Sequence, residues 1–134
     1  MDWPIAAIAA LLSPASAAGP SVASLDCVGT GQSSGYPSGV QQRGETRYRV
    51  EGRGPQTHVW TRGGKDQNIC PPGATCTIEV SKELVHVSVS RIPNADPLYS
   101  TSFHLDRGTL TFDAHGGGLD GGWSVNGTCA PSAH

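Results

Sequence analysis

The stretch that decides the fold runs from Cys76 to Asp113 and reads CTIEVSKELVHVSVSRIPNADPLYSTSFHLDRGTLTFD. Apolar and polar residues alternate along it with a period of two, which is the signature of strands buried on one face. β-branched and aromatic residues fill most of the apolar positions, as a pleated sheet favours. Polar linkers at 81–83, 92–97 and 106–108 interrupt the alternation. The stretch therefore predicts four antiparallel strands in succession.

One register keeps the apolar side chains of these four strands on the same face of the sheet. The inner rows that it predicts are Val80–Val85–Leu105–Leu110 and Ile78–Val87–Phe103–Phe112. The outer rows are Glu79–His86–His104–Thr111 and Thr77–Ser88–Ser102–Asp113. Gly108 in the last linker predicts a tight hairpin turn with a positive φ. A β-bulge in any strand would shift one pair by a residue.

The rest of the chain also favours strands and turns, with 18 glycines and a single methionine. Strands are expected at 25–29, 46–51 and 58–61, and a last strand should turn Trp123, Val125 and Cys129 inward. Glycine-rich loops are expected at 29–39 and 115–122, and a polar loop at 62–68. The sequence predicts an all-β fold, either a small up-and-down antiparallel barrel of about eight strands or a sandwich.

Four cysteines in a short exported chain predict two disulfides, for which three pairings are possible. Cys70 and Cys76 bracket a short turn that could close locally, and this leaves Cys27 with Cys129. A bridge from the first strand to the last favours the barrel, because closure of an up-and-down barrel makes those strands neighbours. A structural zinc site would need CxxC-type spacing, which the sequence lacks.

The beginning of the chain has the pattern of an export signal. An apolar run at 5–12 is followed by the small residues SPASAAG, so we expect 1–18 to be a signal peptide and 19–134 to be a single all-β domain, periplasmic or secreted. Asp2 is unusual there, since the segment has no Lys or Arg. The apolar run is too short to span a bilayer, so no transmembrane segment is expected in the mature chain.

The predicted outer row brings Glu79, His86 and His104 side by side, with Cβ atoms about 4.5–5.5 Å apart. Two imidazoles and a carboxylate could bind Zn²⁺ or Cu²⁺, or act as a general acid and base. The simpler interpretation is a solvated polar face, as antiparallel sheets commonly have. No other cofactor is expected. The stretch Gly35-Tyr36-Pro37-Ser38-Gly39 does not match the G-x-S-x-G motif of hydrolases, and no strand-to-helix elbow is expected around it, which favours a protein that is not an enzyme.

Basic residues gather in the first half of the chain, where six of the nine Lys and Arg residues lie between 43 and 65. Arg47 and Arg49 share the solvent face of one predicted strand, with Arg53 and Arg62 at nearby turns. This patch could bind an anionic polysaccharide, a lipid headgroup or an acidic protein surface, with Trp60 as an aromatic anchor. The same arginines could instead protect an edge strand from aggregation. A net charge of −2 gives no global reason to expect nucleic acid.

The segment LDRGTLTF at 105–112, followed by a glycine-rich stretch and Gly127-Thr128-Cys129, resembles the closing section of short exported bacterial β-proteins. That group is largely uncharacterised, so the resemblance implies location and fold rather than activity. In size and bridging the chain is also similar to small periplasmic barrels that inhibit lysozyme, but their inhibitory loop matches no stretch here.

Together these features favour an exported, non-enzymatic binding module. Its partner would be an envelope component, a polysaccharide or a foreign enzyme. A metal-binding protein or metal-dependent enzyme that uses Glu79, His86 and His104 is the alternative. A structural envelope protein is the third candidate.

Overall fold

The computed structural model describes residues 21–35, 39–63, 65–119 and 121–132, with the side chains of 35–43 left out. The predicted signal peptide at 1–18 lies outside the described residues. The strands are β1 (Ser21–Gly35), β2 (Gly39–Arg53), β3 (His58–Arg62), β4 (Gln67–Asn68), β5 (Thr75–Val80), β6 (Leu84–Ser90), β7 (Ser100–Asp106), β8 (Thr111–Gly118) and β9 (Gly121–Pro131). A short 3₁₀ helix, η1 (Gly54–Gln56), joins β2 to β3. The described residues contain no helix with the length and apolar character needed to cross a membrane.

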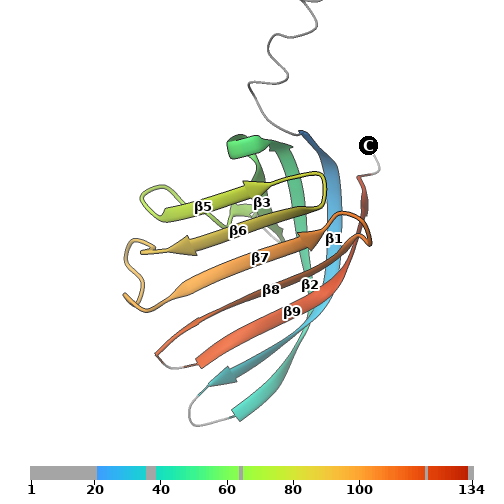
Figure 1. Ribbon diagram of the computed structural model, residues 1–134. Helices are drawn as coiled ribbons and strands as arrows, with labels where there is room; N and C mark the ends of the chain where they lie inside the picture. The colour runs from blue at the N-terminus through green and yellow to red at the C-terminus, as the bar shows by residue number, and fades with distance from the viewer. Residues whose placement is uncertain (1–20, 36–38, 64, 120, 133–134) are drawn as a thin grey trace, which may run out of the picture.

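The strands form one antiparallel sheet in the order β4-β3-β2-β1-β9-β8-β7-β6-β5. Strands that follow one another in the chain are neighbours, and β1 also pairs with β9. The exception is β4 and β5, which lie at the two edges. The sheet curls strongly, so that it forms a half-barrel open between these edges (Figure 1). The predicted all-β class and up-and-down order are confirmed, and the barrel is incomplete, with nine described strands.

Both predicted disulfides are present. Cys27 and Cys129 lie directly opposite each other on β1 and β9, with Cα atoms 4.0 Å apart. This bridge joins the first strand to the last, as expected. The Cys70–Cys76 bridge closes the connection from β4 to β5, which is the connection that crosses the open side of the half-barrel.

The predicted register is correct for three of the four strands and wrong for the fourth. Leu105 lies opposite Val85 as expected, but on its other side it faces Phe112 rather than Leu110. The cause is the turn after β7, which covers residues 107–110. In it Leu110 takes the positive φ, 57°, that was expected of Gly108. The Asp106 carboxylate stabilises the turn by accepting hydrogen bonds from the amides of Gly108 and Thr109.

The loops predicted at 29–39 and 115–122 are largely strand. β1 continues to Gly35, and the β8–β9 hairpin extends from Gly118 to Gly121 with little loop between. Several of these glycines lie within strands, where another group packs closely against the backbone. A Cβ on Gly29 would lie 2.5 Å from the carbonyl oxygen of Asn126 and 2.9 Å from the ring of Phe112. Glycine is therefore needed where the curled sheet and a large ring approach the backbone.

The core lies on the concave face of the sheet. The rings of Tyr48, Phe103 and Phe112 contact one another with centroids 5.3 to 5.6 Å apart. Tyr48 and Val50 point inward, as the alternation predicts, and are buried. Valines of β2, β3, β6 and β9 complete the cluster. Full burial of one such side chain contributes about 1.5–3 kcal/mol. Burial of this cluster therefore stabilises the curled form of the sheet.

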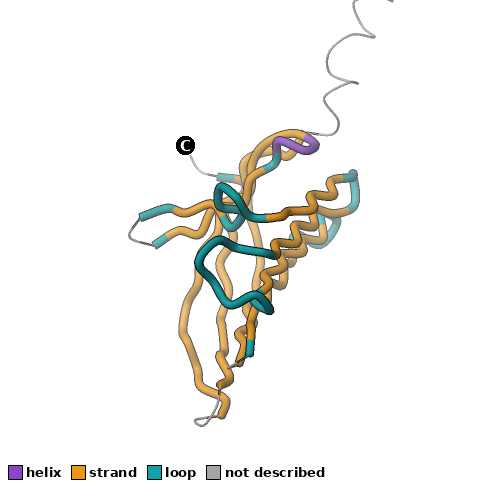
Figure 2. The backbone as a smooth tube through the Cα atoms, turned by 90° about the vertical axis from the view of Figure 1, so that its left-hand side faces the viewer, coloured by secondary structure: helices purple, strands orange, loops and turns teal. Residues whose placement is uncertain are grey.

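The loop from β6 to β7 and the connection from β4 to β5 lie side by side (Figure 2). Gly73 in one is so close to Pro93 in the other that a Cβ on the glycine would lie 2.9 Å from the proline ring. The connection enters β5 at Thr75 and the loop leaves β6 at Ser90, which pairs with Thr75, so both segments lie at the same end of these strands (Figure 1). They form part of the border of the hollow described next.

Candidate functional site

The concave face is packed at one end and hollow at the other. The hollow has a volume of about 920 Å³, within the range of small-molecule binding sites. Its walls come from β2, β3, β4, β7 and β9 and from the two border segments. The lining residues are Thr46, Tyr48, Thr61, Gln67, Asn68, Ile69, Pro71, Pro72, Ile92, Tyr99, Thr101, Trp123 and Val125. We call this hollow the groove.

Trp123 and Tyr99 are the half-buried aromatic side chains of the groove wall, to which the buried Tyr48 also contributes. The indole Nε1 of Trp123 donates a hydrogen bond to the hydroxyl of Tyr99 at 3.3 Å. Trp123 faces Gly116 on β8, and a Cβ on that glycine would lie 2.8 Å from the indole. The absence of a side chain at Gly116 therefore lets the indole lie close against the sheet. The pair is half-buried and presents a ring surface to the groove.

Polar groups in the groove are hydroxyls and amides. Thr46, Thr61 and Thr101 line it from three strands, with Gln67 at the edge. The Thr61 hydroxyl donates to the carbonyl oxygen of Gln67 at 3.2 Å. Among the lining residues of the described chain there is no Asp, Glu, His, Lys or Arg. This lining suits an uncharged ligand that has both apolar and hydrogen-bonding surface.

The groove has a neighbouring hollow of about 390 Å³, and Tyr99 and Trp123 line both of them. The other walls of this second hollow include Ser33, Asp96 and Leu119. The two hollows together make an elongated depression, which favours an extended ligand over a compact one.

A carboxylate fixes the rim beside Tyr99. The Asp96 side chain accepts hydrogen bonds from the amide of Leu119 at 2.8 Å and from that of Leu98 at 2.9 Å. These two amides lower the pKa of Asp96 below its ordinary value. The contacts tie the β6–β7 loop to the β8–β9 turn. Leu98 and Leu119 are 65% and 72% exposed, so this rim presents apolar side chains to solvent.

The histidine row predicted on the outer face is present. Glu79 lies opposite His86, and His86 opposite His104. His86 Nδ1 is 3.8 Å from Glu79 Oε1, and the two imidazole centroids are 5.6 Å apart. On the other side of His104 lies Asp113 instead of the predicted Thr111. His86 Nε2 is within hydrogen-bonding distance of serine hydroxyls on the same face. Within the described ranges, no three His, Cys, Asp or Glu residues are arranged to hold a metal ion.

The predicted basic residues lie on the outer face of β2 and β3, away from the groove. Three of the four arginines have a carboxylate partner, and these pairs are Arg47–Glu45, Arg49–Asp26 and Arg62–Asp66. The hydrogen bond from Arg49 lowers the pKa of Asp26. Arg53 is exposed at the end of β2. Trp60 lies opposite Arg49 on the outer face, with its ring 5.8 Å from that of His58. An anionic partner would compete with the existing carboxylates.

No protein-family model matches the chain, and searches of curated proteins and of solved structures find no match either. Fold and site together define an open antiparallel half-barrel with an elongated groove in its concave face.

The sequence did not reveal this groove. Its alternation placed Tyr99, Thr101 and Trp123 on the inner face. The alternation did not show that no other segment covers the inner face around Tyr99 and Trp123. That depends on how distant strands and loops are placed in the curled sheet.

Proposed function

We propose that this protein is an exported, non-enzymatic binding module that holds a segment of a neutral polysaccharide in the groove. The observation that carries the proposal is the Trp123–Tyr99 pair, which lines both a groove without charged lining residues and the hollow next to it. Sugar rings have flat apolar faces that pack on aromatic side chains, and their hydroxyls bond to hydroxyl and amide groups. The groove offers both kinds of group.

A sugar chain accounts for the lining better than an alkyl chain does. An alkyl chain would cover the side chains of Thr46 and Gln67 without giving them hydrogen-bond partners. Leaving one buried polar group unpaired costs about 1–3 kcal/mol. A charged glycan is also disfavoured here, since no lining side chain carries a compensating charge. Export of the protein is supported by its two disulfides.

Calorimetric titration of the full, oxidised chain with neutral hexasaccharides tests the proposal, with cellohexaose, chitohexaose and maltohexaose as probes. We expect saturable binding of at least one of them. Trp123→Ala should weaken binding by at least tenfold, because the stacking surface is lost. Trp60→Ala, which removes an indole from the outer face, should leave the affinity within twofold.

Two results would count against the proposal. Absence of binding by all three neutral glycans excludes the ligand class. A loss of affinity in Trp60→Ala that equals the loss in Trp123→Ala removes the groove as the site. Binding of a protein partner at the groove, with no glycan affinity, would support the foreign-enzyme interpretation instead.

The alternative is metal binding by Glu79, His86 and His104. It is favoured by their adjacent places in one cross-strand row. A shared ion would require both imidazoles to turn toward one point, and His86 to leave its serine partners. Zinc titration followed by histidine NMR signals tests this: stoichiometric shifts of both rings at neutral pH support it, and unchanged signals exclude it.

A further inference from the structure

A second, smaller hollow lies on the opposite face of the sheet. It has a volume of about 190 Å³ and is lined by residues of β1, β2 and β3, several times the roughly 30 Å³ that a water molecule occupies. The side chains of Cys27 and Tyr48 point to the interior and are buried, so at these positions the main chain faces this hollow. Its polar walls are Asp26, Arg47, Arg49 and Arg62.

The three arginines lie close together although their positive charges repel one another. Arg47 and Arg62 lie directly opposite each other on β2 and β3. Like charges in directly opposed positions of a sheet are destabilising. Arg49 follows two residues after Arg47, so its side chain leaves the same face of β2. The carboxylates of Glu45, Asp26 and Asp66 offset part of this repulsion, and an anionic group bound between the guanidinium groups would offset more of it.

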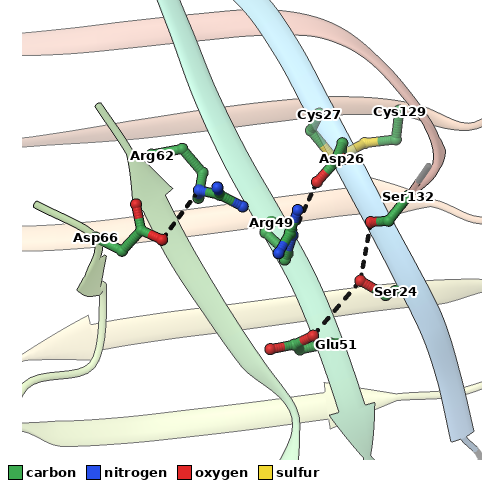
Figure 3. Close-up of polar contacts among 9 residues, drawn as sticks. All are labelled: Ser24, Asp26, Cys27, Arg49, Glu51, Arg62, Asp66, Cys129 and Ser132. Atoms are coloured by element: carbon green, nitrogen blue, oxygen red, sulfur yellow. Dashed lines mark hydrogen bonds and ion pairs between the residues drawn. A yellow bond between two sulfur atoms is a disulfide. The ribbon is translucent and has the colours of Figure 1, made fainter. Parts of the chain in front are cut away.

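The carboxylate partners of two of these arginines stand at the outer ends of the cluster. Figure 3 shows the order along the sheet as Asp66, Arg62, Arg49 and Asp26. The closest contacts are 3.0 Å from Arg62 Nε to Asp66 and 2.9 Å from Arg49 Nε to Asp26. A guanidinium has five N–H donors, and one carboxylate accepts two of them in a bidentate pair. Donors therefore remain for an acceptor between Arg62 and Arg49.

Both of these side chains are also partly shielded from water. The exposed fraction is 27% for the side chain of Arg49 and 33% for that of Arg62, against 62% for Arg47. Charge-assisted hydrogen bonds are stronger where water competes less. The fixed planar fork of arginine matches the oxygen spacing of phosphate and of carboxylate.

We propose that Arg47, Arg49 and Arg62 form a binding site for an oxyanion, the phosphate or sulfate group of a small ligand. This site goes beyond the proposed function, since it lies on the other face of the sheet and shares only Tyr48 with the groove. The anion hydrogen-bonds to the guanidinium donors that the carboxylates leave over. Asp26 also lines the hollow and repels the anion, which weakens binding.

NMR titration of the ¹⁵N-labelled full, oxidised chain with inorganic phosphate and with sulfate tests the site, at ionic strength held constant with chloride. We expect saturable shifts of the arginine Nε–H signals and of the Val28 and Arg47 amides. Arg62→Lys keeps the charge but loses the fork, and it should weaken binding at least fivefold. Lys82→Gln removes a remote positive charge and should change the affinity less than twofold.

The Asp66→Asn variant distinguishes binding at this site from a general screening of surface charge by the added anion. It frees Arg62 from its carboxylate and should tighten phosphate binding severalfold. Linear, unsaturated shifts, equal effects of Arg62→Lys and Lys82→Gln, or no tightening in Asp66→Asn would each overturn the proposal. The same spectra show whether each variant is folded. Repeating the titration with glucose 6-phosphate and glucose 6-sulfate distinguishes the two ligand sources: tighter binding of one of these esters than of its inorganic anion identifies that ester class.

Discussion

The two ends of the concave face differ although the same strands build both. At the packed end, Phe103, Phe112 and Tyr48 meet with ring centroids 5.3 to 5.6 Å apart, and Phe103 is completely buried. At the open end, Tyr99 and Trp123 border a hollow of about 920 Å³. β7 and β9 contribute residues to both regions.

The difference comes from the size of the inward-facing residues. Large apolar side chains face one another at the packed end. At the open end Gly116 and Thr101 occupy neighbouring inward positions. The Trp123 indole covers Gly116, and the small side chain of Thr101 lines the groove beside it. A period-two pattern therefore fixes which face is inside. Residue volume decides whether that face becomes core or binding site. Stability should depend on the packed end, and ligand binding on the open end.

The largest expected effect concerns the two disulfides. Cys27→Ser/Cys129→Ser should lower the free energy of unfolding by about 4–5 kcal/mol, because this bridge closes a long loop in the unfolded chain. Cys70→Ser/Cys76→Ser removes a bridge that closes a loop of few residues, and it should cost about 2 kcal/mol. Urea unfolding of both double variants measures the two values. Equal losses would contradict the chain-entropy account.

The next effect separates the two ends by truncating one aromatic side chain at each. Phe103→Ala should lower the free energy of unfolding by about 3–5 kcal/mol through the cavity it leaves. Tyr99→Ala should cost about 1 kcal/mol, since it removes a half-buried ring and one hydrogen bond. Glycan affinity should show the reverse order. If Tyr99→Ala destabilises the protein as much as Phe103→Ala, the open end belongs to the core.

A third change should stabilise the packed end. The Thr57 side chain is buried, and its hydroxyl has no hydrogen-bond partner within the described part of the chain. Thr57→Val keeps the shape and removes the unpaired group, which costs about 1–3 kcal/mol when buried. Thermal and urea unfolding should therefore show a gain of about 1 kcal/mol. A loss would mean that the hydroxyl has a partner in solution.

Gly116→Ala changes the open end alone. The added methyl group would lie 2.8 Å from the indole of Trp123, so the ring must move away from the sheet. We expect glycan affinity to fall about tenfold while the free energy of unfolding changes by about 1 kcal/mol. Titration and urea unfolding of the same preparation test both. Unchanged affinity would show that the position of the indole is unimportant.

The smallest effect is on the pH dependence of stability, through the rim carboxylate. The folded-state pKa of Asp96 lies below its unfolded value of about 3.8. Its contribution to stability is therefore fully present above that value and is lost as the pH falls through the folded pKa. Asp96→Asn should lose less stability than the unmodified chain between pH 5 and pH 2. Thermal unfolding of both proteins over this range is the measurement, and parallel curves would contradict it.

Some of this structure could be predicted from the sequence for clear physical reasons. Alternation predicted the pairing of Val85 with Leu105 because a one-residue slip would expose the whole apolar face. It failed at β8 because Leu110 adopts a left-handed conformation that nothing in its residue type indicates. Gly29 and Gly116 were interpreted as loop residues, whereas they allow rings to pack against the backbone. The groove depends on distant segments, which local patterns do not place.

The central claim is that ligand binds at the open end of the concave face. ¹⁹F NMR of the full chain labelled with 5-fluorotryptophan tests it most directly, because Trp123 lines the groove and Trp60 lies on the other face. The full chain has three tryptophans, and Trp123→Phe and Trp60→Phe assign the signals of these two, which leaves the third signal to Trp3. On addition of the bound hexasaccharide, the account predicts a saturable shift of the Trp123 signal and a constant Trp60 signal. A shift of Trp60 with Trp123 unchanged would contradict it.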